Sequence, residues 1–166
     1  MRGSQREWAR GGTESAEPMA GPELTLDDIT GKLVDAAYKQ HTGLGPGLVA
    51  SVYEVVLAWE LERRGLRVVR QKSVTFEFDG LTFRDCLRAD MLVESCVVVE
   101  IKSVEKTLPV HQRQLLTYLR LMHLRVGLLI NFGAATLREG LQRIVHELPP
   151  SASPREPFAL RFEVRH

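Results

Sequence analysis

Two carboxylates and a lysine near the middle of the chain have the residue types and spacing of a hydrolytic metal site. Asp90 lies in one strand-like run, and Glu100 and Lys102 lie in the next, beyond a short turn. If the two runs form a hairpin that pairs symmetrically about Ser95, Asp90 lies directly opposite Glu100. Because side chains alternate between the two faces of a strand, Lys102 is then expected on the same face.

The closeness of the two carboxylates indicates a cation site. Opposed carboxylates about 5 Å apart repel by roughly 3 kcal/mol at an effective dielectric constant of about 20, and a cation reverses the sign of that energy. Mg²⁺ takes oxygen ligands and keeps several waters, so Asp90, Glu100 and the backbone carbonyl of Ile101 form a partial coordination shell. Lys102 is suited to positioning a water or stabilising charge on a scissile phosphate, which is the chemistry of metal-assisted phosphodiester hydrolysis. Spacing alone also allows an exposed Glu-Lys strand face beside an unrelated aspartate.

A predicted helix after these strands carries further polar residues. Pro109 favours a helix start, and the helix is expected to run to about His123. His111, Gln114 and Tyr118 fall at positions i, i+3 and i+7, on the side away from its apolar stripe. This polar face is expected to border the carboxylates. The alternative is an ordinary solvated face with a half-buried tyrosine.

The N-terminal half of the chain predicts two helices. Thr25 to Asp28 is a capping-box pattern that predicts a helix start, and apolar residues at helical spacing follow it. The glycine-rich stretch 43–47 ends that helix, and a second helix is expected over 48–64. The glycine-rich stretch lacks the Lys-Ser/Thr of a P-loop and follows no strand, so it is interpreted as a helix-helix turn.

The period changes to that of strands beyond Gly65. Alternating and β-branched residues around the Asp79-Gly80 turn predict a hairpin, which continues into the two runs described above as an antiparallel meander. The continuous apolar run 126–132 predicts a buried strand. The element order α-α-β-β-β-α-β therefore predicts an α/β fold, with a central mixed β-sheet flanked by helices.

Length and composition predict one folded domain in a chain of 166 residues, with 44% apolar and 26% charged residues. The expected boundaries are a flexible leader at 1–22, the folded domain at 23–148 and a Pro-rich linker and tail at 149–166, in which 158–164 forms an edge strand or docked tail. Cys86 and Cys96 are expected to be free core thiols in a reducing compartment. With no apolar run of membrane-spanning length and no signal peptide, a cytoplasmic location without membrane association is expected.

Basic residues near the end of the second predicted helix offer one surface for a polyanion. They are Arg63, Arg64, Arg67, Arg70 and Lys72. Because Glu60 and Glu62 lie beside them and the formal net charge is only +1, mixed solvated charge is the alternative interpretation.

The site residues together resemble the D, ExK and QxxxY series of PD-(D/E)xK nuclease-like proteins. They are Asp90, the Glu100-Ile101-Lys102 triplet and the segment from Gln114 to Tyr118. The stretch 43–145 more closely resembles the small family named for its GxxExxY motif. This resemblance implies a restriction-endonuclease-like core, dependence on Mg²⁺ with Mn²⁺ as a second suitable ion, and a nucleic-acid partner, DNA ahead of RNA. It also implies that Asp90 and Glu100 are metal ligands, Lys102 is the catalytic lysine, and Gln114 and Tyr118 are outer contacts.

The sequence departs from the naming motif at one position. The motif has a glutamate three residues after its glycine, where Ala50 follows Gly47 here. This departure implies a weakened nuclease or, alternatively, an inactive nuclease-like domain that binds nucleic acid or another protein. Glu54 lies one helical turn later and is an accessory candidate together with His111, although its Cβ starts about 6 Å from that of Ala50. A homodimer that pairs through a sheet edge or through 126–132 is compatible with either reading.

Overall fold

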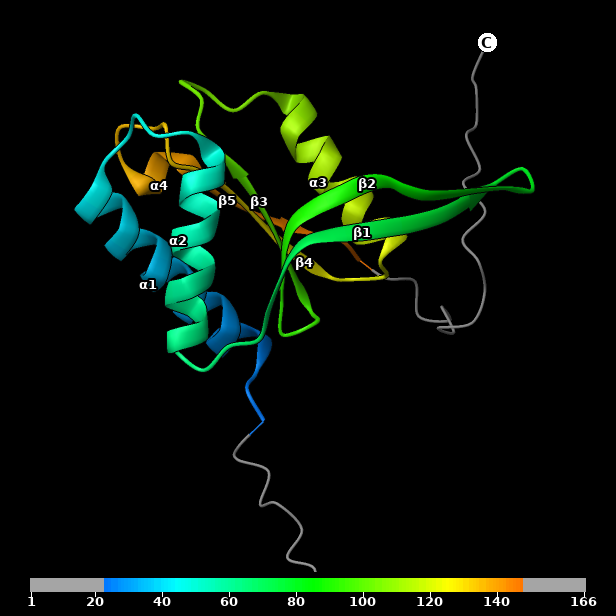
Figure 1. Cartoon of the computed structure of the whole chain (residues 1–166), viewed down its shortest axis with the longest axis horizontal. Helices are drawn as coiled ribbons and strands as arrows, with labels where there is room; N and C mark the ends of the chain where they lie inside the picture. The colour runs from blue at the N-terminus through cyan, green and yellow to red at the C-terminus, as the bar shows by residue number, and fades with distance from the viewer. Residues whose placement is uncertain (1–22, 148–166) are drawn as a thin grey trace, which may run out of the picture.

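A five-stranded mixed sheet with helices on both faces makes up the part of the chain that the computed structural model describes, residues 23–147 (Figure 1). Helices α1 (Leu26–Leu44) and α2 (Ala50–Arg63) cover one face, and α3 (Pro109–Leu121) covers the other. The predicted α/β fold of the restriction-endonuclease type, with its central mixed sheet, is therefore confirmed. The predicted leader at 1–22 and the tail at 149–166, including the expected strand at 158–164, lie outside the described residues.

The sheet is a meander followed by a crossover. The strands β1 (Val68–Phe78), β2 (Leu81–Val93), β3 (Val97–Lys102), β4 (Val126–Asn131) and β5 (Leu141–Val145) lie side by side in chain order. Only β3 and β4 are parallel, because α3 carries the chain back across the sheet between them. A four-residue helix, α4 (Leu137–Gly140), leads into β5. The sequence pattern did not predict α4 and β5, which are short and partly exposed.

The helical layer begins as the capping pattern predicts. The Thr25 hydroxyl accepts a hydrogen bond from the Asp28 amide at 3.1 Å, and the Thr25 amide donates to the Asp28 carboxylate at 2.9 Å. At the turn into α2, the Tyr53 hydroxyl donates to the carbonyl of Gly45, whose φ of +67° is a left-handed conformation that glycine adopts without strain. The Tyr53 ring stacks on Phe132 with centroids 4.5 Å apart. These contacts fix the start of α2 over the end of the sheet.

Alternation along β3 divides the core into two layers. Val97, Val99 and Ile101 pack against α1 and α2, whereas Val98 packs against α3. The predicted hairpin register is confirmed at Leu92, which pairs with Val98. Glu100 and Lys102 consequently belong to the α3 face, on which Lys102 contacts Gln114 of α3.

Strict alternation fails in β2 at Asp90. Ala89 packs in the same core layer as Leu92, although residues three apart in a regular strand point to opposite faces. The β1–β2 ladder pairs Arg70 with Met91 and Lys72 with Ala89, and passes over the position between them. The predicted placement of Asp90 on the same regular face as Leu92 is therefore wrong, because the strand is irregular where Asp90 lies.

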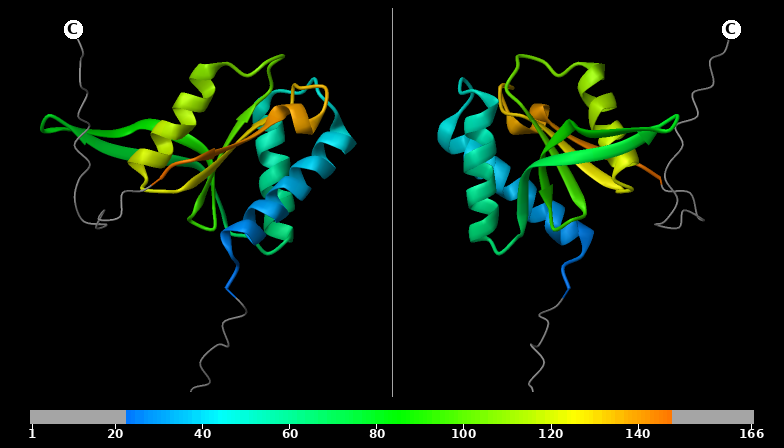
Figure 2. Two further views of the ribbon diagram at one scale, coloured as in Figure 1. Left: turned by 180° about the vertical axis from the view of Figure 1, so that it is seen from behind. Right: turned by 45° about the vertical axis from the view of Figure 1, so that its right-hand side comes forward.

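Beyond this irregularity, β1 and β2 extend away from the body as a twisted two-stranded arm (Figures 1 and 2). Phe76 and Phe83 stack across it with centroids 4.7 Å apart, and Asp79-Gly80 forms the predicted turn at its tip. Cys86 lies exposed on the arm, so its expected core location is wrong, while Cys96 is half-buried. Both thiols are free, as expected.

Two further expectations concern surfaces. Strand β4, which covers most of the predicted run 126–132, pairs with β3 on one side and with β5 on the other, so it has no open edge in the described sheet. The sheet edges are β1 and β5. None of the described helices is long and apolar enough to span a bilayer.

Candidate functional site

A pocket opens between the first turns of α2 and the irregular part of the sheet. Ala50 and Glu54 line it from α2, Gln71 from β1, Asp90 from β2 and Lys102 from β3. A larger pocket at the other end of β3 includes Arg67, Glu94 and His123 in its lining, but Asp90 and Lys102 are not part of it. Asp90 and Lys102 therefore share the pocket beside α2, whereas Glu100, Gln114 and Tyr118 are not among the residues that line it.

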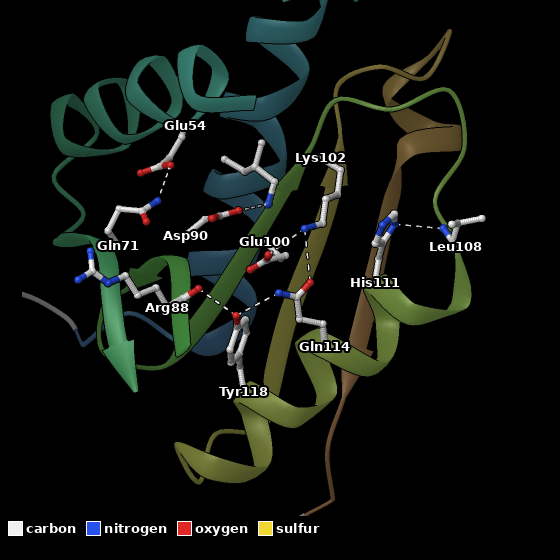
Figure 3. Close-up of polar contacts among 11 residues, drawn as sticks. Glu54, Gln71, Arg88, Asp90, Glu100, Lys102, Leu108, His111, Gln114 and Tyr118 are labelled. Atoms are coloured by element: carbon white, nitrogen blue, oxygen red, sulfur yellow. Dashed lines mark hydrogen bonds and ion pairs between the residues drawn. The ribbon is translucent and has the colours of Figure 1, made fainter. Parts of the chain in front are cut away.

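Asp90 is held by the backbone of β3. Its Oδ2 accepts a hydrogen bond from the Ile101 amide at 2.7 Å (Figure 3). In a continued ladder that amide would donate to a main-chain carbonyl of β2, and the described β2–β3 ladder instead ends at the pair Met91 and Val99. The symmetric hairpin predicts that Asp90 and Glu100 form a ladder pair. This prediction is wrong, because the ladder ends before it reaches them. Burial raises the pKa of Asp90. The hydrogen bond from the Ile101 amide lowers this pKa, and the negative charge of Glu54 raises it further.

Glu100 is an almost fully buried acid with one unused oxygen. Its residue exposure is 2%, its Oε1 lies 3.1 Å from the Lys102 ammonium, and its Oε2 has no hydrogen-bond partner. Burial, followed by the charge of Asp90, raises the pKa of Glu100 to about 7, although Lys102 opposes the shift. A buried carboxylate oxygen without a donor is costly unless a cation or proton satisfies it.

Lys102 belongs to a chain of polar contacts that crosses to α3 (Figure 3). The Lys102 ammonium donates to Gln114 Oε1 at 3.5 Å, and the Gln114 amide nitrogen donates to the Tyr118 hydroxyl at 3.1 Å. The Tyr118 hydroxyl in turn donates to the Arg88 carbonyl of β2 at 3.0 Å. Since an ammonium can only donate, the Gln114 amide orientation is determined. Burial raises the pKa of Tyr118, which keeps its hydroxyl a donor.

The backbone direction of β3 places a third oxygen near Asp90. The Lys102 carbonyl accepts from the Phe132 amide, on the β4 side of the strand, whereas the Ile101 amide points to Asp90 on the β2 side. The amide and carbonyl of one strand residue point the same way, so the Ile101 carbonyl is also directed toward β2. Asp90, Glu100 and this carbonyl can supply the small number of protein oxygens that Mg²⁺ takes alongside water. No group of three or more His, Cys, Asp or Glu side chains within 23–147 is arranged to hold a metal ion.

Glu54 and His111, the two accessory candidates, are placed differently. Glu54 lines the pocket at 5% exposure, with Oε1 accepting from Arg70 Nε at 2.9 Å and Oε2 from the Gln71 amide at 2.8 Å. His111 instead turns to the start of its own helix, where Nδ1 accepts from the Leu108 amide at 3.1 Å (Figure 3). His111 therefore acts as a helix cap, and Glu54 is the accessory residue that reaches the pocket.

The basic residues beside α2 are mostly neutralised. Arg64 pairs with Glu60, Arg67 with Glu94 and Arg70 with Glu54, each with a shortest separation of 2.8 or 2.9 Å. Arg63 instead lies over the Trp59 ring, 4.5 Å from its centroid. This arrangement agrees with the mixed-charge interpretation better than with a dedicated polyanion surface.

Gln71 lines the pocket, although no sequence pattern marks it as a functional residue. It lies inside β1 with φ +49°, a conformation rare for any residue but glycine, asparagine or aspartate. A glutamine in an alternating strand carries no signal of such a conformation. Only the three-dimensional ladder shows that Gln71 and Asp90 occupy the same irregularity.

One comparison with known sequences identifies the superfamily of this chain. Residues 27–144 match the sequence profile of the PD-(D/E)XK nuclease superfamily. A solved crystal structure of SSO0001 is similar to this chain with a TM-score of 0.44 and 17% sequence identity, covering 73% of this chain and 79% of the other. No curated protein matches the chain significantly.

Proposed function

Because this chain belongs to the PD-(D/E)XK nuclease superfamily, we propose that it hydrolyses phosphodiester bonds of nucleic acid with a divalent cation held by Asp90, Glu100 and the Ile101 carbonyl. Mg²⁺ is the proposed ion, Mn²⁺ a second suitable one, and DNA is the proposed substrate ahead of RNA. We also propose, from the resemblance over 43–145, that the chain belongs to the family named for the GxxExxY motif.

The observation that carries the proposal is the unpartnered Oε2 of buried Glu100 beside the half-buried carboxylate of Asp90. Burial and then the charge of Asp90 raise the pKa of Glu100, and such a pair of acids fits a site that is completed by positive charge. The bound cation would supply a lowered pKa for water and charge neutralisation at the phosphate.

The protein's own contribution centres on Lys102. Its side chain is only 21% exposed, and two acceptors hold its ammonium, Glu100 Oε1 and Gln114 Oε1. It therefore faces the position of an attacked phosphate with little freedom to move. Gln114 and Tyr118 keep that position by linking Lys102 to the β2 backbone. In this proposal, they orient the lysine without taking part in the bond change.

A direct test is cleavage of duplex DNA, single-stranded DNA and RNA in Mg²⁺ or Mn²⁺ by the full chain. Asp90→Ala and Lys102→Ala should each remove cleavage. Lys39→Ala is the matched control, because Lys39 also forms an ion pair with a glutamate, Glu60, at 3.0 Å but lies on α1 away from the pocket. Cleavage that persists in both site variants would identify a contaminating nuclease and overturn the proposal.

The alternative function, a nuclease-like domain that binds nucleic acid or protein without cleavage, is favoured by Ala50. Its methyl group lines the pocket and offers no oxygen to a cation. If the site is complete except for this position, Ala50→Glu should increase Mn²⁺ affinity and create or increase cleavage. Nucleic-acid binding that is independent of metal, with no gain from Ala50→Glu, would favour the binding module.

A further inference from the structure

Glu54 reaches the pocket but is already fully engaged. Its two oxygens accept from Arg70 and from Gln71, and the side chain is only 5% exposed. A carboxylate that coordinates a cation directly would have to release one of these donors. Glu54 is therefore close to the pocket, but neither of its oxygens is available to bind a cation.

Gln71 connects Glu54 to Asp90. Because the Glu54 carboxylate only accepts, the Gln71 nitrogen must face it, which determines the amide orientation. Gln71 and Asp90 occupy the same interruption of the β1–β2 ladder and line the same pocket, and Figure 3 shows Glu54, Gln71 and Asp90 next to one another. The Gln71 amide thus binds one carboxylate, that of Glu54, and lies beside a second, that of Asp90.

The backbone at Gln71 interrupts the ladder: its φ is +49°, and it lies between the pairs Arg70 with Met91 and Lys72 with Ala89. The same interruption releases Asp90 from strict alternation. Left-handed conformations of residues other than glycine are strained and persist only where surrounding contacts impose them. The hydrogen bond from the Gln71 amide to Glu54 is one such contact.

We propose that Gln71 is a positioning residue that orients Asp90 for the divalent cation, and that Glu54 acts through Gln71 instead of binding the cation itself. The inference rests on the proposed metal-dependent function. Carboxylates that ligate metals are typically held by hydrogen bonds from an outer layer of residues, and loss of such a partner weakens metal binding by roughly 10- to 100-fold. The Ile101 amide holds Asp90 from β3, and Gln71 lies beside Asp90 in β1, at the same interruption of the ladder and in the same pocket.

The test is Mn²⁺ affinity of the full chain, measured by calorimetry or by the electron paramagnetic resonance of free Mn²⁺. Gln71→Leu, which keeps the side-chain size but removes the amide, should weaken binding by roughly 10-fold or more. Gln71→Asn should weaken it too, because the amide is one methylene short, while asparagine tolerates the left-handed backbone and preserves folding. Gln112→Leu is the matched control, since the Gln112 amide bonds to Gln142 and not to the pocket.

A double-mutant cycle with Glu54→Gln separates the two roles of Glu54. If Glu54 acts through Gln71, the double variant should bind Mn²⁺ about as weakly as Gln71→Leu alone. If the losses of Mn²⁺ affinity in the two single variants instead multiply in the double variant, Glu54 is itself a ligand and the inference is overturned. Unchanged Mn²⁺ affinity in folded Gln71→Leu and Gln71→Asn would also overturn it. Failure of the unmodified protein to bind Mn²⁺ is a different result, which removes the proposed function and this inference with it.

Discussion

Replacing Glu100 with glutamine should stabilise the metal-free protein at alkaline pH. Glutamine has the shape of protonated Glu100 and carries no charge, so it avoids the burial of a carboxylate that has one unpartnered oxygen. The pKa of Glu100 rises from 4.5 to about 7 on folding, mainly because of burial. At roughly 1.4 kcal/mol per pKa unit, ionised Glu100 costs the folded state about 3 kcal/mol.

The sign follows from proton binding. Between the unfolded and folded pKa values the folded protein binds more protons at Glu100, so this residue lowers the free energy of unfolding as the pH rises through that window. The stability difference between Glu100→Gln and the unmodified protein should therefore grow by about 2–3 kcal/mol from about pH 5 to about pH 8. Urea unfolding in EDTA, followed by circular dichroism, measures it.

A matched control with the opposite sign is Glu60→Gln. Hydrogen bonds from Lys39 and then Arg64 lower the pKa of Glu60, so its ionised form favours folding above its unfolded pKa and loses that effect as the pH falls. Glu60→Gln should thus destabilise the protein at about pH 8, and less so in acid. If the stability difference for Glu100→Gln is the same at both pH values, the argument that Glu100 is held in an unfavourable ionised state is refuted.

Three further perturbations test the parts that hold the site. Tyr118→Phe removes the bridge between the β2 backbone and α3, so we expect about 1 kcal/mol lower stability and slower cleavage with little change in Mn²⁺ affinity, measured by unfolding and kinetics. His111→Ala removes only a helix cap and should cost about 0.5 kcal/mol in unfolding experiments, leaving Mn²⁺ affinity unchanged; a large affinity loss would contradict its assignment as a cap. Asn131→Ala removes three bonds that tie Val104 and Gly133 to a buried amide, and should cost about 2–3 kcal/mol in urea unfolding.

Local patterns predicted most elements of the fold. The Thr25 to Asp28 capping box, the Asp79-Gly80 turn and the apolar run of β3 each involve only a few residues, and each forms as expected. α4 and β5 escaped prediction because four helical residues and a half-exposed strand carry too little periodicity, and their position depends on β4 as a pairing partner. Pairing with β4 is a long-range contact that no local window contains.

Some residues of the candidate site could likewise be predicted from local sequence, and others depend on long-range contacts. Glu100 and Lys102 lie in one regular strand, so their shared face follows from sequence parity alone, and the contact between them is a consequence of that spacing. The irregularity at Asp90 could not be predicted, because it depends on a left-handed Gln71 in another strand and on Glu54 from a helix.

Local sequence patterns therefore establish the set of chemical groups, the order of most elements and the strand that carries Glu100 and Lys102. Tertiary contacts establish the direction of Asp90, the engagement of Glu54 by Arg70 and Gln71, and the unpartnered oxygen of Glu100. Side-chain periodicity is local, whereas burial and hydrogen-bond satisfaction depend on which distant elements meet.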